Sequence, residues 1–352
     1  MIIDAHAHNL SGGSLSNYYT QLLSNGGAHG HEEYRVSDDE ADAALNRPVF
    51  RGKSLIDQVR EVGTDLQLLS PRPISMGHSA KPEKIVHWYI EAQNNIIARQ
   101  CALHPDLFRG VCGLPQNAGV SPANSVEELT RCVKELGFVG CLLNPDPNEG
   151  YSPPPPALGS EYWYPLYEAL VSLDVPALIH STRCGNEREP YTLHFINEEN
   201  TAIISLLESR VFLDFPNLKL IVSHGGGAIP YQIGRFRSFY DRPGRRVLDT
   251  QEDFDTSLRR LYFDTALYTK KALEVLFEAV GADRCLFGTE RPGTGTSLDP
   301  KTGKWMDDIK PLIEDIDWLT ADDRQRIFEE NARDLYKLDL AGVARRATAA
   351  AS

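Results

Sequence analysis

Short apolar runs recur along the chain and are separated by longer segments with helical spacing. The eight runs cover residues 1–6, 64–70, 107–114, 137–143, 175–180, 218–224, 260–266 and 283–289. Continuous apolar runs of this length are typical of parallel strands that are buried on both faces. The clearest helical patterns between them lie at residues 84–104, 125–137, 163–174 and 271–283. This alternation predicts an α/β fold, a (β/α)8 TIM-type barrel, in preference to a doubly wound open sheet.

The spacing of the runs also indicates how the chain is organised into domains. We expect residues 1–340 to form one barrel domain and residues 341–352 to form a flexible tail. The polar stretch at about 9–60 is too long for an ordinary strand-to-helix connection. We interpret it as an insert at the carboxyl-terminal rim of the barrel, covering the rim or contacting another subunit of a homo-oligomer.

Composition narrows the classes of partner. The chain has 352 residues, of which 41% are hydrophobic, and a formal net charge of −13, which argues against nucleic acid as a partner. No segment reaches the roughly 18 apolar residues that a membrane span needs, and no signal peptide is recognisable. The six cysteines show no CxxC pairing, and several lie in apolar runs, which favours a reduced, cytoplasmic setting.

Ligand-type residues stand at the ends of several predicted strands. They are His6, His8, His180, His224 and Glu290. In a barrel of this kind the carboxyl ends of the strands meet at one face, where function collects. Three imidazoles and a carboxylate suit Zn²⁺, with Mn²⁺, Fe²⁺ or Co²⁺ as alternatives. The fourth run ends without a lysine that could bridge two ions, so these residues predict a single metal.

Several motifs carry a family resemblance. The segments "DAHAH", "PALIH" and "IVSHGGG" resemble the amidohydrolase superfamily, in the branch of the amino-carboxymuconate semialdehyde and hydroxybenzoate decarboxylases. That branch usually has Asp after the eighth strand, whereas this chain has Glu290 in "FGTERPG". Together with "SPRPISMGH" and "FPNLKLIVSHGGGAIPYQIGRFR", this glutamate makes the chain similar to the family of 4-oxalomesaconate hydratases, from Met1 to about Tyr336.

The resemblance implies a role for individual residues. The implied metal ligands are His6, His8, His180 and Glu290. The implied acid and base groups are His224 and Glu290. The implied contacts to substrate carboxylates are Arg72, Ser75, Asn197 and Arg235. Arginine suits this task because its planar guanidinium binds carboxylates in a bidentate manner.

The activity that the resemblance implies is a metal-dependent hydro-lyase. It would add water to the C=C bond of an unsaturated oxo-di- or tricarboxylic acid such as 4-oxalomesaconate, in the protocatechuate branch of aromatic catabolism. The alternatives are a non-oxidative decarboxylase of an aromatic or muconate-type acid, a hydrolase on the same scaffold, and a non-catalytic binding protein. Arg183, Arg188, His194 and Arg291 depart from the family pattern, which favours a related carboxylate as substrate.

Overall fold

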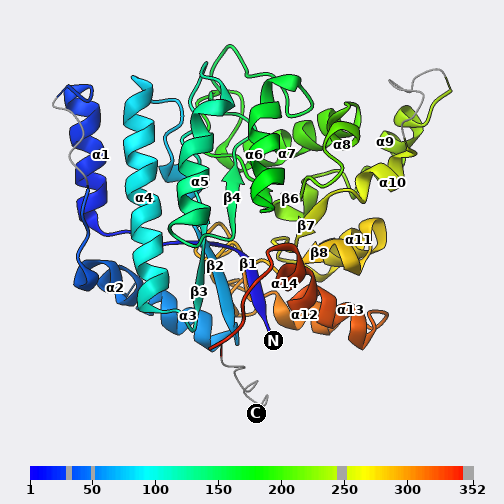
Figure 1. The fold of residues 1–352 in the computed structure, drawn as a ribbon. Coiled ribbons are helices and arrows are strands. Elements are labelled where there is room, and N and C mark those ends of the chain that lie inside the picture. The colour runs from blue at the N-terminus through cyan, green and yellow to red at the C-terminus, as the bar shows by residue number, and fades with distance from the viewer. Residues whose placement is uncertain (29–33, 49–51, 244–251, 344–352) are drawn as a thin grey trace.

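Eight parallel strands form one sheet in the order of the chain (Figure 1). This computed structural model describes residues 1–28, 34–48, 52–243 and 252–343. The strands are β1 (Ile3–His8), β2 (Leu66–Ser70), β3 (Phe108–Cys112), β4 (Gly140–Leu143), β5 (Ala177–Ile179), β6 (Leu220–Val222), β7 (Tyr262–Asp264) and β8 (Cys285–Leu286). Seven of the eight predicted runs contain one strand each, and the first run, 1–6, overlaps β1, which extends to His8.

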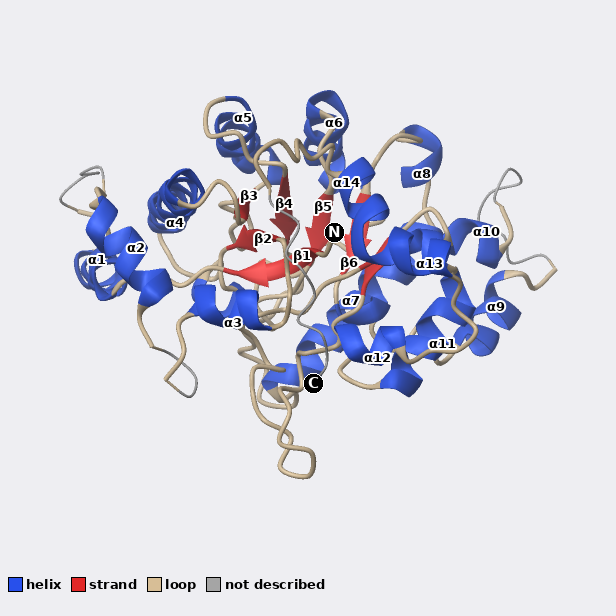
Figure 2. Ribbon diagram, turned by 90° about the horizontal axis from the view of Figure 1, so that it is seen from below, coloured by secondary structure: helices blue, strands red, loops and turns tan. Residues whose placement is uncertain are grey.

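Backbone hydrogen bonds bring the last strand against the first. Ala5 N–H donates to the Phe287 carbonyl at 2.8 Å, and Glu290 N–H donates to the His6 carbonyl at 2.7 Å. His8 N–H donates to the Arg291 carbonyl at 3.0 Å. Figure 2 shows the strands surrounded by helices. The predicted (β/α)8 barrel is therefore confirmed, and its closure places Glu290 directly against β1.

The helices follow the strands and cover the outside of the barrel (Figure 2). They are α1 (Gly13–Asn25), α2 (Asp38–Asn46), α3 (Leu55–Glu61), α4 (Glu83–Leu103), α5 (Val126–Lys134), α6 (Tyr164–Leu173), α7 (Tyr191–Leu207), α8 (Val211–Asp214), α9 (Ile233–Tyr240), α10 (Phe254–Leu258), α11 (Lys270–Val280), α12 (Lys310–Glu314), α13 (Ala321–Gln325) and α14 (Asn331–Leu335). The four predicted helices correspond to α4, α5, α6 and α11.

Apolar strand residues alternate between two buried clusters. Leu178 packs in one cluster, whereas its neighbours Ala177 and Ile179 pack in the other, together with residues of the surrounding helices. Ile221 alternates with its own neighbours in the same way. Successive strand side chains point to opposite faces, so a strand covered on both faces needs apolar residues at every position. This burial is the reason that the strands appear as continuous apolar runs.

In its described residues, the stretch at 9–60 contains α1, α2 and most of α3 in place of an ordinary loop. In Figure 1, α1 lies beside α4, and Leu15 and Leu22 of α1 pack against Ile85 and Tyr89 of α4. The insert thus buries apolar surface on the outer side of a barrel helix. Residues 344–352 lie outside the described residues, so the flexible tail stays a prediction, as does the single-domain boundary at 340.

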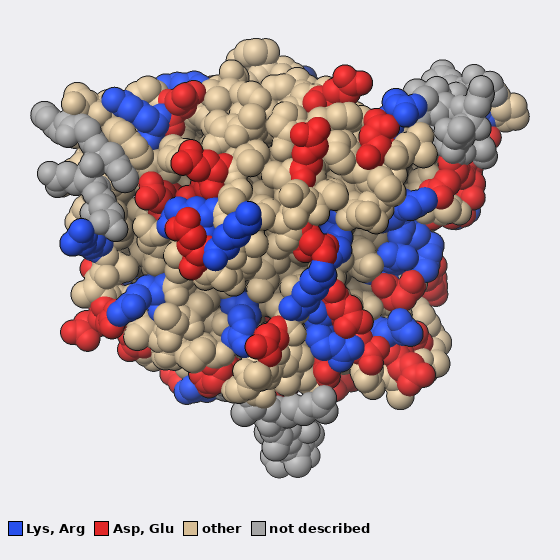
Figure 3. Space-filling model, in the orientation of Figure 1, with Lys and Arg blue, Asp and Glu red and all other residues tan. Residues whose placement is uncertain are grey.

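The surface carries both signs of charge. On the face shown in Figure 3, Lys and Arg alternate with Asp and Glu, and no large area of one sign appears. In the described ranges, no helix is both long enough and apolar enough to cross a membrane. All six cysteines lie in these ranges, and none of them forms a disulfide.

Candidate metal and acid–base site

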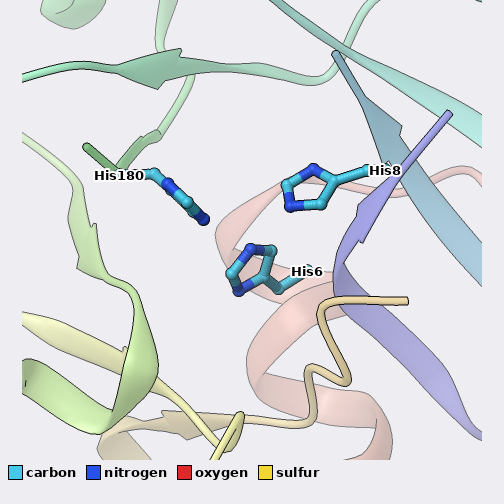
Figure 4. Close-up of side chains that lie close together, drawn as sticks. All are labelled: His6, His8 and His180. Atoms are coloured by element: carbon cyan, nitrogen blue, oxygen red, sulfur yellow. The ribbon is translucent and has the colours of Figure 1, made fainter. Parts of the chain in front are cut away.

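Three histidines point toward one another at the ends of β1 and β5 (Figure 4). His6 and His8 are two residues apart on β1, and His180 directly follows β5. The ring centroids of these histidines lie 5.0–5.4 Å apart, and all three side chains are buried. Burying three imidazoles together is unfavourable unless their polar atoms have partners.

The Nδ1 atom of each ring has a protein partner. His6 Nδ1 contacts Asp264 Oδ2 at 2.5 Å, and His180 Nδ1 donates to the Ser181 carbonyl at 2.6 Å. His8 Nδ1 lies 2.9 Å from Ser70 Oγ. Because the Ser70 hydroxyl already donates to the Ala7 carbonyl, it accepts from His8. These contacts place the ring proton on Nδ1 and leave a lone pair on Nε2.

The three Nε2 atoms are buried and have no hydrogen-bond partner among the described residues. The three histidines form one group in which a potential ligand atom from each lies within 4.8 Å of the other two. Burial, with the charge of neighbouring imidazoles, holds the pKa values of His8 and His180 well below the ordinary value. Neutral imidazoles with free Nε2 lone pairs, each held through Nδ1, fit a divalent metal ion.

Glu290 and His224 extend this cluster. His224 Nε2 lies 3.4 Å from Glu290 Oε1, and both side chains form a second group of potential ligands with His180. The two groups share His180, and neither contains all four predicted metal ligands. The three-histidine group and the group that contains Glu290 therefore meet at His180.

Backbone strain is concentrated at this cluster. His224, Tyr268 and Glu290 have φ values of 49°, 56° and 61°, in the left-handed region that side chains other than glycine rarely adopt. The Tyr268 hydroxyl donates a short hydrogen bond to Glu290 Oε2. Such conformations cost on the order of 1–3 kcal/mol each and are typical of functional sites.

Two carboxylates act on His224. Glu199 Oε1 lies 2.5 Å from His224 Nδ1, on the side of the ring opposite Glu290. Although burial opposes it, Glu199 and Glu290 raise the pKa of His224 well above its ordinary value. Burial raises the pKa of Glu290. The hydrogen bond and the charge of His224 nevertheless lower this pKa well below its ordinary value. The arrangement favours a protonated imidazole beside an ionised carboxylate.

A cavity of about 240 Å³ opens beside these two groups. Its walls combine His224, Tyr268 and Glu290 with apolar side chains such as Phe195 and Leu267. A larger cavity of about 840 Å³ lies along α9, but none of the clustered histidines lines it. The smaller cavity is the candidate substrate site because it contains the candidate acid and base.

The structure brings only some of the predicted substrate contacts to this site. Arg72 is half-buried. Burial and the charge of His6 lower the pKa of His8 most, and the positive charge of Arg72 lowers it further. Ser75 ends a short 3₁₀ turn after β2. Asn197 donates instead to Glu189 Oε1 at 2.8 Å. Arg235 is exposed on α9 and lines the larger cavity, so this chain does not bring it to the cluster.

The residues that depart from the family pattern have different environments. Arg291 is buried in an ion pair with Asp307 and also donates to the Gln58 carbonyl at 3.1 Å, so it serves the core. Arg188 is exposed, whereas His194 is buried. Burial of Arg291 removes it from the set of residues that could contact substrate.

Sequence reasoning gave no role to Glu199 or Tyr268. Glu199 lies on α7, 25 residues before the histidine that it contacts. Tyr268 lies in the turn after β7, and its contact with Glu290 depends on the closure of the barrel. Neither residue belongs to a local motif, whereas Asp264 ends β7 within the seventh predicted run, where polar residues at strand ends are expected.

The chain is similar to known proteins over most of its length. Residues 3–338 match the amidohydrolase family. The chain is 35% identical over 355 residues to 2-keto-4-carboxy-3-hexenedioate hydratase of Sphingobium sp., covering 96% of both chains. It is 28% identical over 260 residues to gamma-resorcylate decarboxylase of Polaromonas sp., covering 70% of this chain and 75% of that protein.

Two solved structures extend the comparison. The 4-oxalomesaconate hydratase of Rhodopseudomonas palustris superposes with a TM-score of 0.82 and 33% identity, over 96% of both chains. The dihydroxybenzoic acid decarboxylase of Polaromonas sp., solved with bound manganese and an inhibitor, has a TM-score of 0.69 and 21% identity over 96% of both chains. The second likeness concerns the fold alone. Given the family match over nearly its whole length, the chain belongs to the amidohydrolase family.

Proposed function

We propose that this protein is a metal-dependent hydratase that adds water to the C=C bond of an unsaturated oxo-di- or tricarboxylic acid such as 4-oxalomesaconate. Full-length similarity to two hydratases supports the reaction class. The single observation that carries the proposal is the Glu290 carboxylate, which lies 3.4 Å from the His224 imidazole at the edge of a cavity. A base and an acid in contact are what addition of water across a double bond requires.

The metal belongs to the same proposal. His6, His8 and His180 would hold one divalent ion, and we propose Zn²⁺, with Mn²⁺, Fe²⁺ or Co²⁺ as alternatives. When bound, such an ion acts as a Lewis acid and makes water a better nucleophile near neutral pH. That Glu290 is also a ligand stays a prediction, because its oxygens already contact His224 and Tyr268.

The protein's own residues divide the remaining steps. Glu290 takes a proton from the attacking water while the oxygen bonds to the double-bond carbon remote from the carbonyl. The resulting enolate carries negative charge that the Arg72 guanidinium, whose charge already acts on His8, would stabilise. His224 then delivers a proton to the adjacent carbon. Proton return from Glu290 to His224 across 3.4 Å restores the starting state.

Three related expectations accompany the proposal. The substrate is a small carboxylate, and contacts from Ser75, Asn197 and Arg235 stay predictions. A homo-oligomer and the absence of nucleic acid or membrane partners also stay predictions. A cytoplasmic location is supported by six cysteines that form no disulfide.

The experiment that tests the proposal incubates the metal-loaded protein with 4-oxalomesaconate. Hydration removes the conjugated double bond, so absorbance should fall without release of carbon dioxide. Release of carbon dioxide would favour the decarboxylase alternative. Removal of the metal with a chelator should abolish turnover, and adding Zn²⁺ or Mn²⁺ back should restore it.

Glu290→Gln tests the base within this reaction. An amide cannot accept the proton, so turnover of the metal-loaded variant should fall on the order of 10²–10⁴-fold. Glu290→Asp is the matched control, because it keeps the charge and shortens the reach by one methylene. Near-normal turnover in metal-loaded Glu290→Gln would contradict a base role.

A further inference from the structure

A second group of metal-ligating side chains lies on α7 and the loop after β4. His194 and Glu198 are four residues apart on α7, a spacing that places both side chains on the same side of the helix. Asp146 lies three residues after the end of β4. One potential ligand atom from each residue lies within 4.8 Å of the other two.

One ring nitrogen of His194 has a protein partner, and the other has none among the described residues. Its Nδ1 lies 3.0 Å from Glu189 Oε2, and a carboxylate there accepts the ring proton. Its Nε2 is buried, has no hydrogen-bond partner among the described residues, and faces Asp146 Oδ2 at 3.7 Å. That separation exceeds a hydrogen bond. A carboxylate that holds a histidine through the far nitrogen is the usual arrangement around metal-bound histidines.

The charge of this group is not balanced by protein cations. Within the described ranges, neither Asp146 nor Glu198 forms an ion pair with a lysine or arginine. Burial, with the charges of Asp146 and Glu189, raises the pKa of Glu198 to about 7. Placing the carboxylates of Asp146 and Glu198 beside the buried lone pair of His194 Nε2 costs free energy, because all three groups are electron-rich. A shared cation would offset this cost.

We propose that Asp146, His194 and Glu198 form a second divalent cation site, distinct from the three-histidine group, and this inference does not rest on the proposed function. One imidazole and two carboxylates suit a transition ion such as Mn²⁺ or Zn²⁺. The ion joins the loop after β4 to α7. Since α7 also carries Glu199, which contacts His224, the second ion holds in place the helix that positions the candidate acid.

The test counts metal ions on the full chain. Protein freed of metal by a chelator is titrated with Mn²⁺ alone, and bound equivalents per chain are measured by the loss of the free-ion electron paramagnetic resonance signal. We expect two equivalents in the wild type and one in Glu198→Gln. Glu187→Gln is the matched control, because it removes the same charge from an exposed neighbouring position and should keep two.

Variants of the first site separate this inference from the proposed function. His8→Ala should bind one equivalent, and the combined His8→Ala, Glu198→Gln protein should bind none. One equivalent in the wild type that survives His8→Ala and is lost in Glu198→Gln would support the second site and contradict the first. An unchanged number of bound Mn²⁺ equivalents in folded Glu198→Gln would overturn the inference. If Glu198→Gln does not fold, the same count is made on Asp146→Asn.

Discussion

Glu199→Gln separates the charge of Glu199 from its geometry. Oε1 of this residue accepts from His224 Nδ1 at 2.5 Å and from Ser223 Oγ at 2.7 Å, whereas Oε2 is buried without a partner among the described residues. An amide whose carbonyl oxygen occupies the Oε1 position would keep both hydrogen bonds and lose the charge. The substitution therefore changes the electrostatics of the acid with little change in its position.

The expected effect follows from the causes that act on His224. Burial lowers the pKa of His224, and Glu199 supplies the largest opposing contribution. Hydrogen bonds to charged groups contribute about 1.5–3 kcal/mol, against about 0.5–1.5 kcal/mol for neutral ones. The difference, about 1–1.5 kcal/mol lost from the protonated imidazole, corresponds to a fall in kcat of roughly 5- to 10-fold. KM and metal content should change little.

The assay is steady-state hydration of 4-oxalomesaconate by metal-loaded protein, with metal analysis of each variant. Ser223→Ala is the control, because it removes the other hydrogen bond to Glu199 without changing its charge and should cost only about 1 kcal/mol of stability. In a His224→Asn background, Glu199→Gln should cause no further loss, since both changes act through one proton. Wild-type kcat in metal-loaded Glu199→Gln would refute the claim that Glu199 keeps His224 protonated.

Three further substitutions test other parts of the structure. Arg72→Ala should lower kcat/KM roughly 10- to 100-fold, chiefly through KM, while metal content stays constant; unchanged kinetics would remove Arg72 from the site. Tyr268→Phe removes the hydroxyl that contacts Glu290 Oε2 and should lower kcat about tenfold in a folded protein, as measured by turnover and circular dichroism. Asp307→Asn leaves the Arg291 guanidinium buried without its charge partner and should destabilise the fold by about 3–5 kcal/mol in denaturant unfolding, so an unchanged midpoint would contradict a structural role.

The helix predicted at residues 125–137 begins at Val126. Ser125 followed by Glu128 is a spacing typical of a helix cap, but the Ser125 side chain makes no cap hydrogen bond. Residues Pro122–Ser125 form a 3₁₀ turn that leads directly into α5, and Ser121 caps that turn instead. The helix itself was correctly predicted, because its apolar spacing does not depend on which serine begins it.

The sequence alone determined the barrel and the residues at the strand ends. Strands covered on both faces require continuous apolar runs, and a parallel barrel brings their carboxyl ends together, so His6, His180 and His224 could be expected at one face. These features follow from local periodicity and from the direction of the strands.

Only the tertiary structure decided which atoms meet. The free Nε2 of His6 depends on Asp264, and the contact at His224 Nδ1 depends on Glu199, a residue on a helix that precedes it. Asn197 is held by Glu189. Hydrogen-bond partners, ring tautomers and side-chain direction depend on neighbours that are distant in sequence. No local pattern encodes them, because they exist only when the packed elements exclude water from the groups that they bring together.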